Sequence, residues 1–247
     1  MQERYLGDVH DFYKFLFLKY LSKKLKKKIG LNWYLISPKL LGANEEKKKD
    51  GENRNYLKKK EICKLDKKIS EEFIKIVDIK KRNITDFTNR THLKSHIKFY
   101  NKQITSERES WFQESVDFFK NNEIIFLDPD NGLLKKENKR NSLKHLLIDE
   151  IDKYLSHGKI IIFTQFQSYN KNHLNYLKEI KNFLNSKNLR ISLPIVRNRT
   201  SPNTFFITLG NQQNLKKKKI FEILKMYNDE IHRSEEHTSE LQSPMYL

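Results

Sequence analysis

One stretch of the chain decides the fold class: it reads IIFLDPDNG and runs from Ile124 to Gly132. Four consecutive apolar residues are typical of a short strand that is buried on both faces, as in a parallel sheet. The run then stops at two carboxylates, a proline, an amide and a glycine, which predict a turn. Ligands of open α/β sheets bind at this end of the strands. The stretch therefore predicts an α/β fold with a candidate site at Asp128–Gly132.

The runs around this stretch predict the other elements. Apolar runs at 29–36, 97–100 and 160–166 predict further strands. Apolar residues at helical spacing predict helices at 8–25, 65–79, 84–91, 106–119, 141–155, 171–184 and 215–227. Ser106 and Glu109 have the spacing of a capping box. Runs at 193–197 and 204–209 flank a polar turn and predict an antiparallel hairpin. We expect a Rossmann-like α/β fold whose mainly parallel sheet is covered by helices on both faces.

The chain of 247 residues is long enough for one large domain. We assign residues 1–232 to a single α/β domain, in which the polar segment 41–60 is expected to be a mobile loop. Residues 233–247 resemble the in-frame translation of a sequencing adapter. We therefore treat that segment as an artefact that is foreign to the native fold.

The charge balance favours a polyanionic partner. The formal net charge is +18. The segment 233–247 contributes +1 from Arg233 and −3 from its glutamates, so residues 1–232 carry +20. Such an excess indicates a nucleic-acid partner, with RNA and DNA both open. The alternative is that the many lysines reflect an AT-rich genome and form solvated faces.

The other composition signals concern the compartment. A single cysteine, Cys63, excludes an intramolecular disulfide and favours the reduced cytoplasm. No apolar run reaches the roughly 18 residues that a membrane span needs, and we see no secretory signal. We therefore expect no membrane partner. The sequence gives no indication of the oligomeric state.

Two short motifs carry a family resemblance. The segment GDVHDFYK, Gly7 to Lys14, has the spacing Gly-x-x-x-Asp-x-x-Lys, and Asp128-Pro129 follows a buried strand. In both respects the chain resembles the class I methyltransferases that use S-adenosylmethionine. It is nearest to the bacterial enzymes that methylate N6 of an adenine in large-subunit ribosomal RNA. The resemblance implies that Gly7, Asp11 and Lys14 contact the cofactor, with Lys14 on its carboxylate.

The resemblance also implies a role for the strand-end turn. Amino-methyltransferases carry Asp-Pro-Pro-Tyr at this place, where the carboxylate and a proline carbonyl accept the two hydrogens of an amine and localise its lone pair. The base first leaves its stack and is held by an aromatic side chain. Asp128 and Pro129 are thus the acceptor pair, and Asp130 and Asn131 complete the candidate catalytic turn. Since these two replace the second proline and the aromatic residue, Phe166 or Tyr169 is the candidate stacking platform.

The first predicted strand departs from the family pattern, because the segment Asn32–Pro38 that ends it contains no glycine pair for a close approach to the cofactor. Trp33 and Tyr34 within it are expected to pack in the core. At the end of the strand 160–166, one of Gln165 and Gln167 is expected to face the crevice.

Three alternatives stay open. The residues Asp128–Gly132 are also typical of a turn that merely caps the following backbone. His10, with Asp8 and Asp11, has the chemistry to join Asp128 and Asp130 around a divalent metal. That set would favour a metal-dependent nuclease or a nucleic-acid processing factor, although we assign no metal ligand. The third alternative is a non-catalytic basic module that binds nucleic acid.

Overall fold

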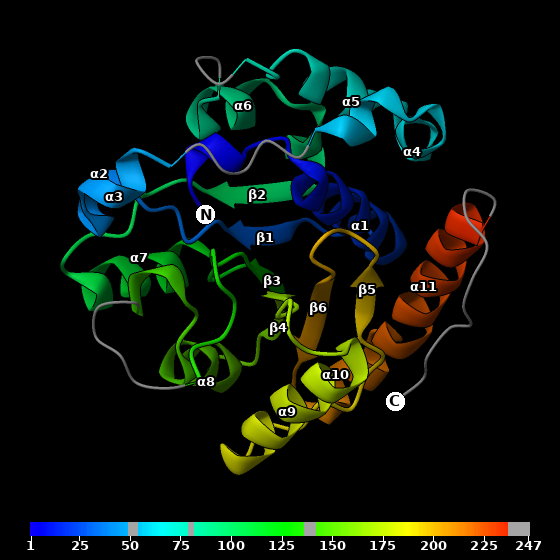
Figure 1. Ribbon diagram of the computed structural model, residues 1–247. Coiled ribbons are helices and arrows are strands. Elements are labelled where there is room, and N and C mark those ends of the chain that lie inside the picture. The colour runs from blue at the N-terminus through cyan, green and yellow to red at the C-terminus, as the bar shows by residue number, and fades with distance from the viewer. Residues whose placement is uncertain (49–53, 79–81, 136–141, 237–247) are drawn as a thin grey trace.

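The computed structural model describes residues 1–48, 54–78, 82–135 and 142–236, and it contains a six-stranded mixed sheet. The strands are β1 (Ile29–Asn32), β2 (Ile97–Tyr100), β3 (Ile124–Leu127), β4 (Ile160–Phe166), β5 (Val196–Asn198) and β6 (Thr204–Leu209). Their order in the sheet is β2-β1-β3-β4-β6-β5 (Figure 1). The first four strands run parallel, and β6 runs antiparallel to both β4 and β5. The predicted mainly parallel sheet and C-terminal hairpin are confirmed.

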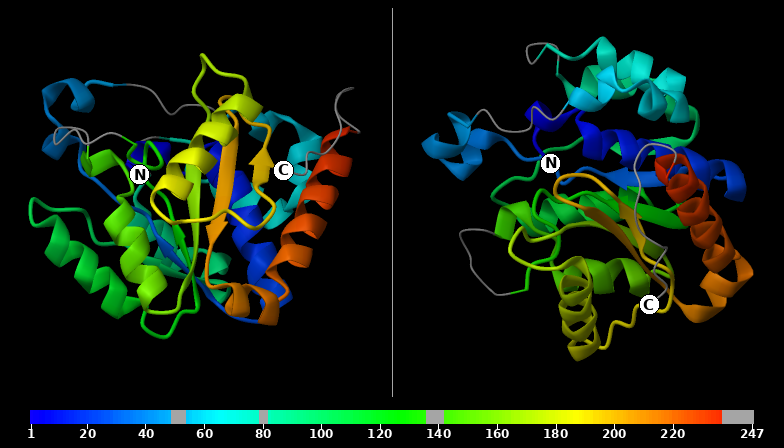
Figure 2. Two further views of the ribbon diagram at one scale, coloured as in Figure 1. Left: turned by 90° about the horizontal axis from the view of Figure 1, so that it is seen from below. Right: turned by 45° about the vertical axis from the view of Figure 1, so that its right-hand side comes forward.

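Helices cover both faces of this sheet (Figure 2). One face packs against α1 (Val9–Leu25), α5 (Lys67–Ile74), α6 (Ile84–Arg90) and α11 (Ile220–Glu236). The other face packs against α7 (Arg108–Phe118), α8 (Ile148–Ser156) and α9 (His173–Ser186). Shorter helices are η1 (Glu3–Tyr5), α2 (Pro38–Leu41), α3 (Ala43–Glu46), η2 (Asn55–Lys58), α4 (Lys60–Leu65), η4 (His92–Ser95), η5 (Ser142–Lys144) and α10 (Gln212–Lys217).

The strand β3 shows why the sheet is buried on both sides. Ile124 and Phe126 point into the core beneath α1, whereas Ile125 and Leu127 point into the core beneath α7 and α8. This follows from the two-residue period of a strand. All four side chains are buried, so the continuous apolar run correctly predicted a central strand. No helix among the described residues is long and apolar enough to cross a membrane.

Several predicted boundaries were wrong. The first strand ends at Asn32 instead of residue 36, because Tyr34 has a φ of 48° and leaves the extended conformation. The helix predicted at 106–119 begins at Arg108, and the capping box from Ser106 does not form. The helix predicted at 65–79 ends at Ile74, and that predicted at 141–155 begins only at Ile148.

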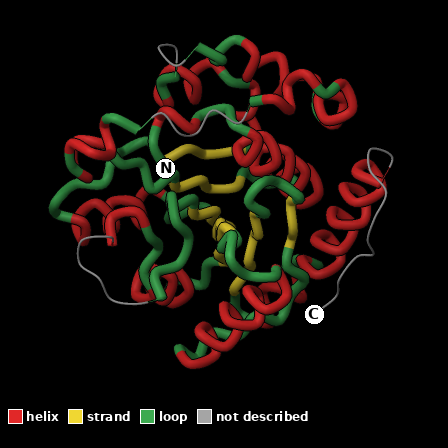
Figure 3. The backbone as a smooth tube through the Cα atoms, viewed as in Figure 1, coloured by secondary structure: helices red, strands yellow, loops and turns green. Residues whose placement is uncertain are grey.

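The structure describes only part of two segments, 41–60, which was expected to be a loop, and 233–247, which was expected to be an artefact. Within 41–60, expected to be a loop, the short helices α3 and η2 form (Figure 3), and residues 49–53 lie outside the described residues. The helix α11 extends to Glu236, and residues 237–247 also lie outside the described residues. The adapter origin of 233–247 therefore stays a prediction.

The close packing of α7 on β1 predicts a strong effect of one added methyl group. A Cβ at Gly30 would lie 2.7 Å from Cδ1 of Phe119. We expect Gly30→Ala to lower the free energy of unfolding by about 1–3 kcal/mol, because the ring has to leave its place in the core. Urea unfolding measures the change.

The matched control is the double variant Gly30→Ala, Phe119→Leu. The smaller side chain makes room for the methyl group, so the two changes should be less destabilising together than the sum of the single changes. Additive effects would show that the Gly30–Phe119 contact is not the cause.

Candidate functional site

A cavity of about 490 Å³ lies at the carboxyl ends of β3 and β4. This volume is within the range of small-molecule sites. The cavity also touches the first turns of α1 and the start of β6. Its walls include Met1, Asp8, His10, Asp11, Lys14, Asp128, Pro129, Asp130, Asn131, Thr164, Phe166, Tyr169, Pro202 and Thr204. The structure thus gathers the whole turn Asp128–Asn131 and both Asp11 and Lys14 around one cavity, while Gly7 lies behind it.

The turn after β3 is held by its own glycine and by a glutamine of β4. Gly132 has a φ of 73°, and a Cβ there would lie 2.5 Å from Oε1 of Gln165. That oxygen accepts a hydrogen bond of 2.8 Å from the amide of Leu133, while Nε2 donates to the hydroxyl of Tyr176. The expectation that Gln165 or Gln167 faces the cavity is wrong, because neither side chain lines it. The role of Gln165 is to position the turn.

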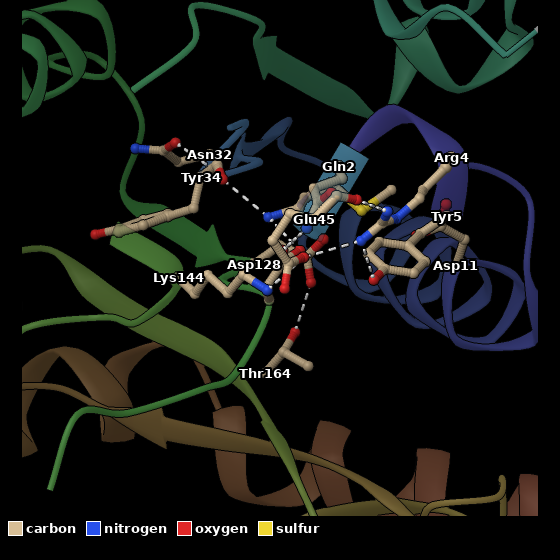
Figure 4. Close-up of polar contacts among 12 residues, drawn as sticks. Gln2, Arg4, Tyr5, Asp11, Asn32, Tyr34, Glu45, Asp128, Lys144 and Thr164 are labelled. Atoms are coloured by element: carbon tan, nitrogen blue, oxygen red, sulfur yellow. Dashed lines mark hydrogen bonds and ion pairs between the residues drawn. The ribbon is translucent and has the colours of Figure 1, made fainter. Parts of the chain in front are cut away.

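Lys14 joins the two motifs of the predicted site. Asp11 and Lys14 are three residues apart on α1 and therefore share one face of the helix. The Lys14 ammonium lies 2.5 Å from Oδ1 of Asp11 and 2.5 Å from Oδ2 of Asp128. All three side chains are buried. The amide of Gly7 donates to Asp11. The Thr164 hydroxyl donates to Oδ1 of Asp128 over 3.0 Å, as Figure 4 shows.

Burial and the neighbouring charges shift the pKa values of Lys14, Asp11 and Asp8. Burial lowers the pKa of Lys14, but the carboxylates of Asp11 and Asp128 outweigh burial and raise the pKa above its usual value. Burial, with repulsion from Asp128, raises the pKa of Asp11 even though Lys14 opposes the shift. Burial and the neighbouring Asp11 raise the pKa of Asp8 to about 8. Lys14 is therefore the cation on which this group of carboxyls depends.

His10 forms the wall of the cavity beside β6. Its Nδ1 lies 2.6 Å from the hydroxyl of Thr204, and its ring meets the ring of Phe166 edge-on at 5.3 Å. Burial and the charge of Lys14 lower the pKa of His10 to about 4, although Asp128 opposes the shift. The imidazole is therefore neutral at pH 7.

Asp130 is engaged by the first two residues of the chain. Its Oδ1 lies 2.8 Å from the α-ammonium of Met1, and its Oδ2 accepts a hydrogen bond of 2.8 Å from the Gln2 amide. The carboxylate thus holds residues 1–2 against the strand ends. Within the described ranges, no group of three or more His, Cys, Asp or Glu residues could hold a metal ion. The ligand set of the nuclease alternative, His10 with Asp8, Asp11, Asp128 and Asp130, is therefore not assembled among the described residues.

The cofactor that the resemblance implies would bind at the switch point of the sheet. The strand order reverses between β1 and β3, where dinucleotide-like ligands bind in open α/β sheets. Here Trp33 and Tyr34 are buried, as expected for core residues. The Met1 ammonium donates to the Tyr34 carbonyl, and the Met1 carbonyl accepts from the amide of Ile36. As these residues lie, they occupy the crevice over β1, and S-adenosylmethionine could bind there only after Met1 had moved.

Some residues of the site were missed by the sequence reasoning. Thr164 and Thr204 supply hydroxyls to Asp128 and His10, Met1 lines the cavity, and the Gln2 side chain donates to Asp130. Thr164 interrupts an apolar strand and was a usable signal, whereas no local pattern marks the other three. Comparisons with protein-family models, with curated proteins and with solved structures found no match.

The arrangement around Lys14 predicts a stability effect. Lys14→Met leaves Asp11 and Asp128 buried without their cation. We expect the free energy of unfolding to fall by about 3–5 kcal/mol, the usual effect of removing one partner of a buried ion pair. Adding Asp128→Asn should restore part of the loss, because one uncompensated charge disappears. Lys24→Met, at an exposed lysine of the same helix, is the control. Equal effects of the two lysine changes would contradict a central role for Lys14.

The lowered pKa of His10 predicts a pH dependence. Below about pH 6.5 the unfolded chain takes up a proton on His10, while the folded protein does so only near pH 4. The buried, neutral His10 therefore does not lower the free energy of unfolding above pH 6.5, but this free energy falls as the pH drops from 6.5 toward 4. Between pH 7.5 and pH 5, His10→Gln should therefore lose about 2 kcal/mol less stability than the wild type. Urea unfolding at both pH values measures this. An NMR titration of His10 with a midpoint near 6.5 would contradict it.

Proposed function

We propose that the cavity beside Asp128 binds the exocyclic amino group of a nucleic-acid base, and that the protein is methyltransferase-like in this respect. One observation carries the proposal. The acceptor pair Asp128-Pro129 and two aromatic side chains, Phe166 and Tyr169, line the same cavity. An amino-bearing base needs both kinds of wall, one to accept its hydrogens and one to stack on its ring.

Asp128 and the Pro129 carbonyl can accept further hydrogen bonds from a ligand. A carboxylate offers about four lone-pair sites, and the described contacts of Asp128 use one on each oxygen, for Lys14 and Thr164. The carbonyl of Pro129 is a second acceptor close by. Together they favour a ligand that donates two hydrogens from one nitrogen, which is what an exocyclic amine does.

The aromatic side supports a flat ligand. Phe166 closes the end of β4, and Tyr169 is 79% exposed although it is a large aromatic residue. Stacking of one base on an aromatic side chain is worth about 1–3 kcal/mol. The neutral imidazole of His10 adds an uncharged wall beside Phe166.

Methyl transfer is the reaction that we propose for this site, on the resemblance to the class I methyltransferases. S-adenosylmethionine would supply the methyl group. Asp128 and the Pro129 carbonyl would hold the amine with its lone pair directed away from its hydrogens. Since Met1 occupies the crevice over β1, it would have to move before a cofactor could enter there.

Nucleoside binding tests the base-binding proposal. We expect adenosine and cytidine, which carry an exocyclic amine, to bind more tightly than inosine and uridine, which lack one. Tyr169→Ala should weaken binding of the amino nucleosides by roughly 5- to 150-fold, measured by calorimetry. Phe221→Ala removes another exposed aromatic residue, on α11, and should leave binding unchanged. Equal affinity for all four nucleosides would exclude recognition of the amine.

The methyl-transfer step has its own test. Calorimetry with S-adenosylmethionine, followed by mass spectrometry of RNA and DNA incubated with protein and cofactor, should show binding and a mass gain of one methyl group. Absence of binding at millimolar cofactor would remove the reaction but leave base binding intact. The two proposals can therefore fail independently.

A further inference from the structure

A second hollow lies at the opposite edge of the sheet from the cavity. It has a volume of about 620 Å³ and lies at the amino ends of β1 and β3. Seven of its thirteen lining residues are lysines and one, Glu123, is acidic, so 7 − 1 leaves a formal charge of +6. We call this surface, which includes Lys27, Lys28 and Lys217–Lys219, the lysine hollow.

The topology of the sheet explains why these lysines meet. Lys27 and Lys28 precede β1, which is parallel to β3, so they lie at the same edge as Glu123 before β3. Because β6 is antiparallel, its last residue also reaches this edge, and the chain continues there into α10. Figure 2 shows the end of α1 (blue) beside the start of α11 (orange). Segments that are almost 200 residues apart thus contribute to one charged surface.

The positive charge of the hollow is poorly balanced. Glu123 pairs with both Lys27 and Lys218, one on each carboxylate oxygen. Burial and the charge of Lys27 lower the pKa of Lys218. No other residue of the described lining is acidic. A concave surface with one sign of charge focuses its potential and attracts counter-charges.

Other lysines of the chain are balanced differently. Lys102 pairs with Glu114 and Lys171 pairs with Glu179, each with a carboxylate of its own. Such one-to-one ion pairs are expected when a chain simply contains many lysines. The lysine hollow has one carboxylate for seven lysines, so composition alone does not account for it.

The shape favours a polymer over a single small anion. The hollow is open, and the exposed residues Lys23, Lys26 and Lys216 continue its charge along the surface at the ends of α1 and α10. Asn121 adds an exposed amide, a group that commonly donates to phosphate. A chain of regularly spaced phosphates can contact such a surface at several points.

We propose that the lysine hollow is a docking surface for the phosphodiester backbone of a nucleic acid. It lies away from the cavity beside Asp128 and does not depend on base binding there. The contacts are to phosphates, so they position the nucleic acid without reading its sequence. Binding should therefore be strong at low salt and weaken steeply as the salt concentration rises.

The test uses the full chain and oligonucleotides of about 30 residues, single- and double-stranded, of RNA and of DNA. In the triple variant Lys28→Gln, Lys217→Gln, Lys219→Gln, all three positions are exposed, so the fold is retained. We expect the slope of log Kd against log salt to fall by roughly 2–3, close to one for each lost phosphate contact. Affinity at low salt should fall at least tenfold for the preferred oligonucleotide.

The control variant has the same change of net charge. Lys178→Gln, Lys181→Gln, Lys187→Gln removes three exposed lysines from α9 and the turn after it. This variant should keep the wild-type slope and affinity. Equal weakening by both variants would show that only the net charge matters, and no binding by the wild type at low salt would also overturn the proposal. Binding of adenosine to the cavity should be the same in all three proteins, which separates this test from that of the proposed function.

Discussion

The buried ammonium of Lys14 is the interaction on which the rest of the site depends. It lies between Asp11 of α1 and Asp128 after β3, so it ties the first helix to the central strand. Taking three charged groups out of water is unfavourable unless each has a partner of opposite charge or a hydrogen bond. Here the Gly7 amide and the Thr164 hydroxyl donate further hydrogen bonds to the carboxylates of Asp11 and Asp128. The same contacts that fix α1 on the sheet therefore form one wall of the cavity.

The two edges of the sheet differ in charge because of how the strands are connected: the cavity lining mixes four aspartates with three lysines, whereas the lysine hollow has one carboxylate among seven lysines. Turns after the parallel strands bring Asp128 and Asp130 to the carboxyl edge, close to Asp8 and Asp11 at the start of α1. The residues before β1 and after β6 bring lysines to the amino edge. A single antiparallel strand, β6, contributes to both, since Thr204 at its start contacts His10 and the chain after its end enters the lysine hollow. The connectivity thus separates the cavity from the surface that we propose for phosphates.

The sequence predicted what depends on local pattern and missed what depends on distant contacts. The run before Asp128 predicted β3 because both faces of a central strand are apolar. Lys14 and Asp128 were assigned to one site only through the methyltransferase resemblance, and their direct ion pair was not predicted. The end of β1 was missed because Tyr34 is held by Met1, and no pattern near Tyr34 indicates that partner. The capping box at Ser106 was wrong because α7 begins only at Arg108, which places Glu107 and not Ser106 at the N-cap position.

The filled crevice over β1 changes what the methyltransferase resemblance can mean. A cofactor that enters there has to displace Met1, and Asp130 and the Tyr34 carbonyl then lose the Met1 ammonium as a partner. Its apparent affinity falls in proportion to the fraction of molecules in which the crevice is open. The cavity that we propose for a base carries no such penalty, because Asp128, Pro129, Phe166 and Tyr169 already line open space. The cavity that we propose for a base is therefore open as the protein stands, whereas the place that the resemblance assigns to the cofactor is occupied by Met1.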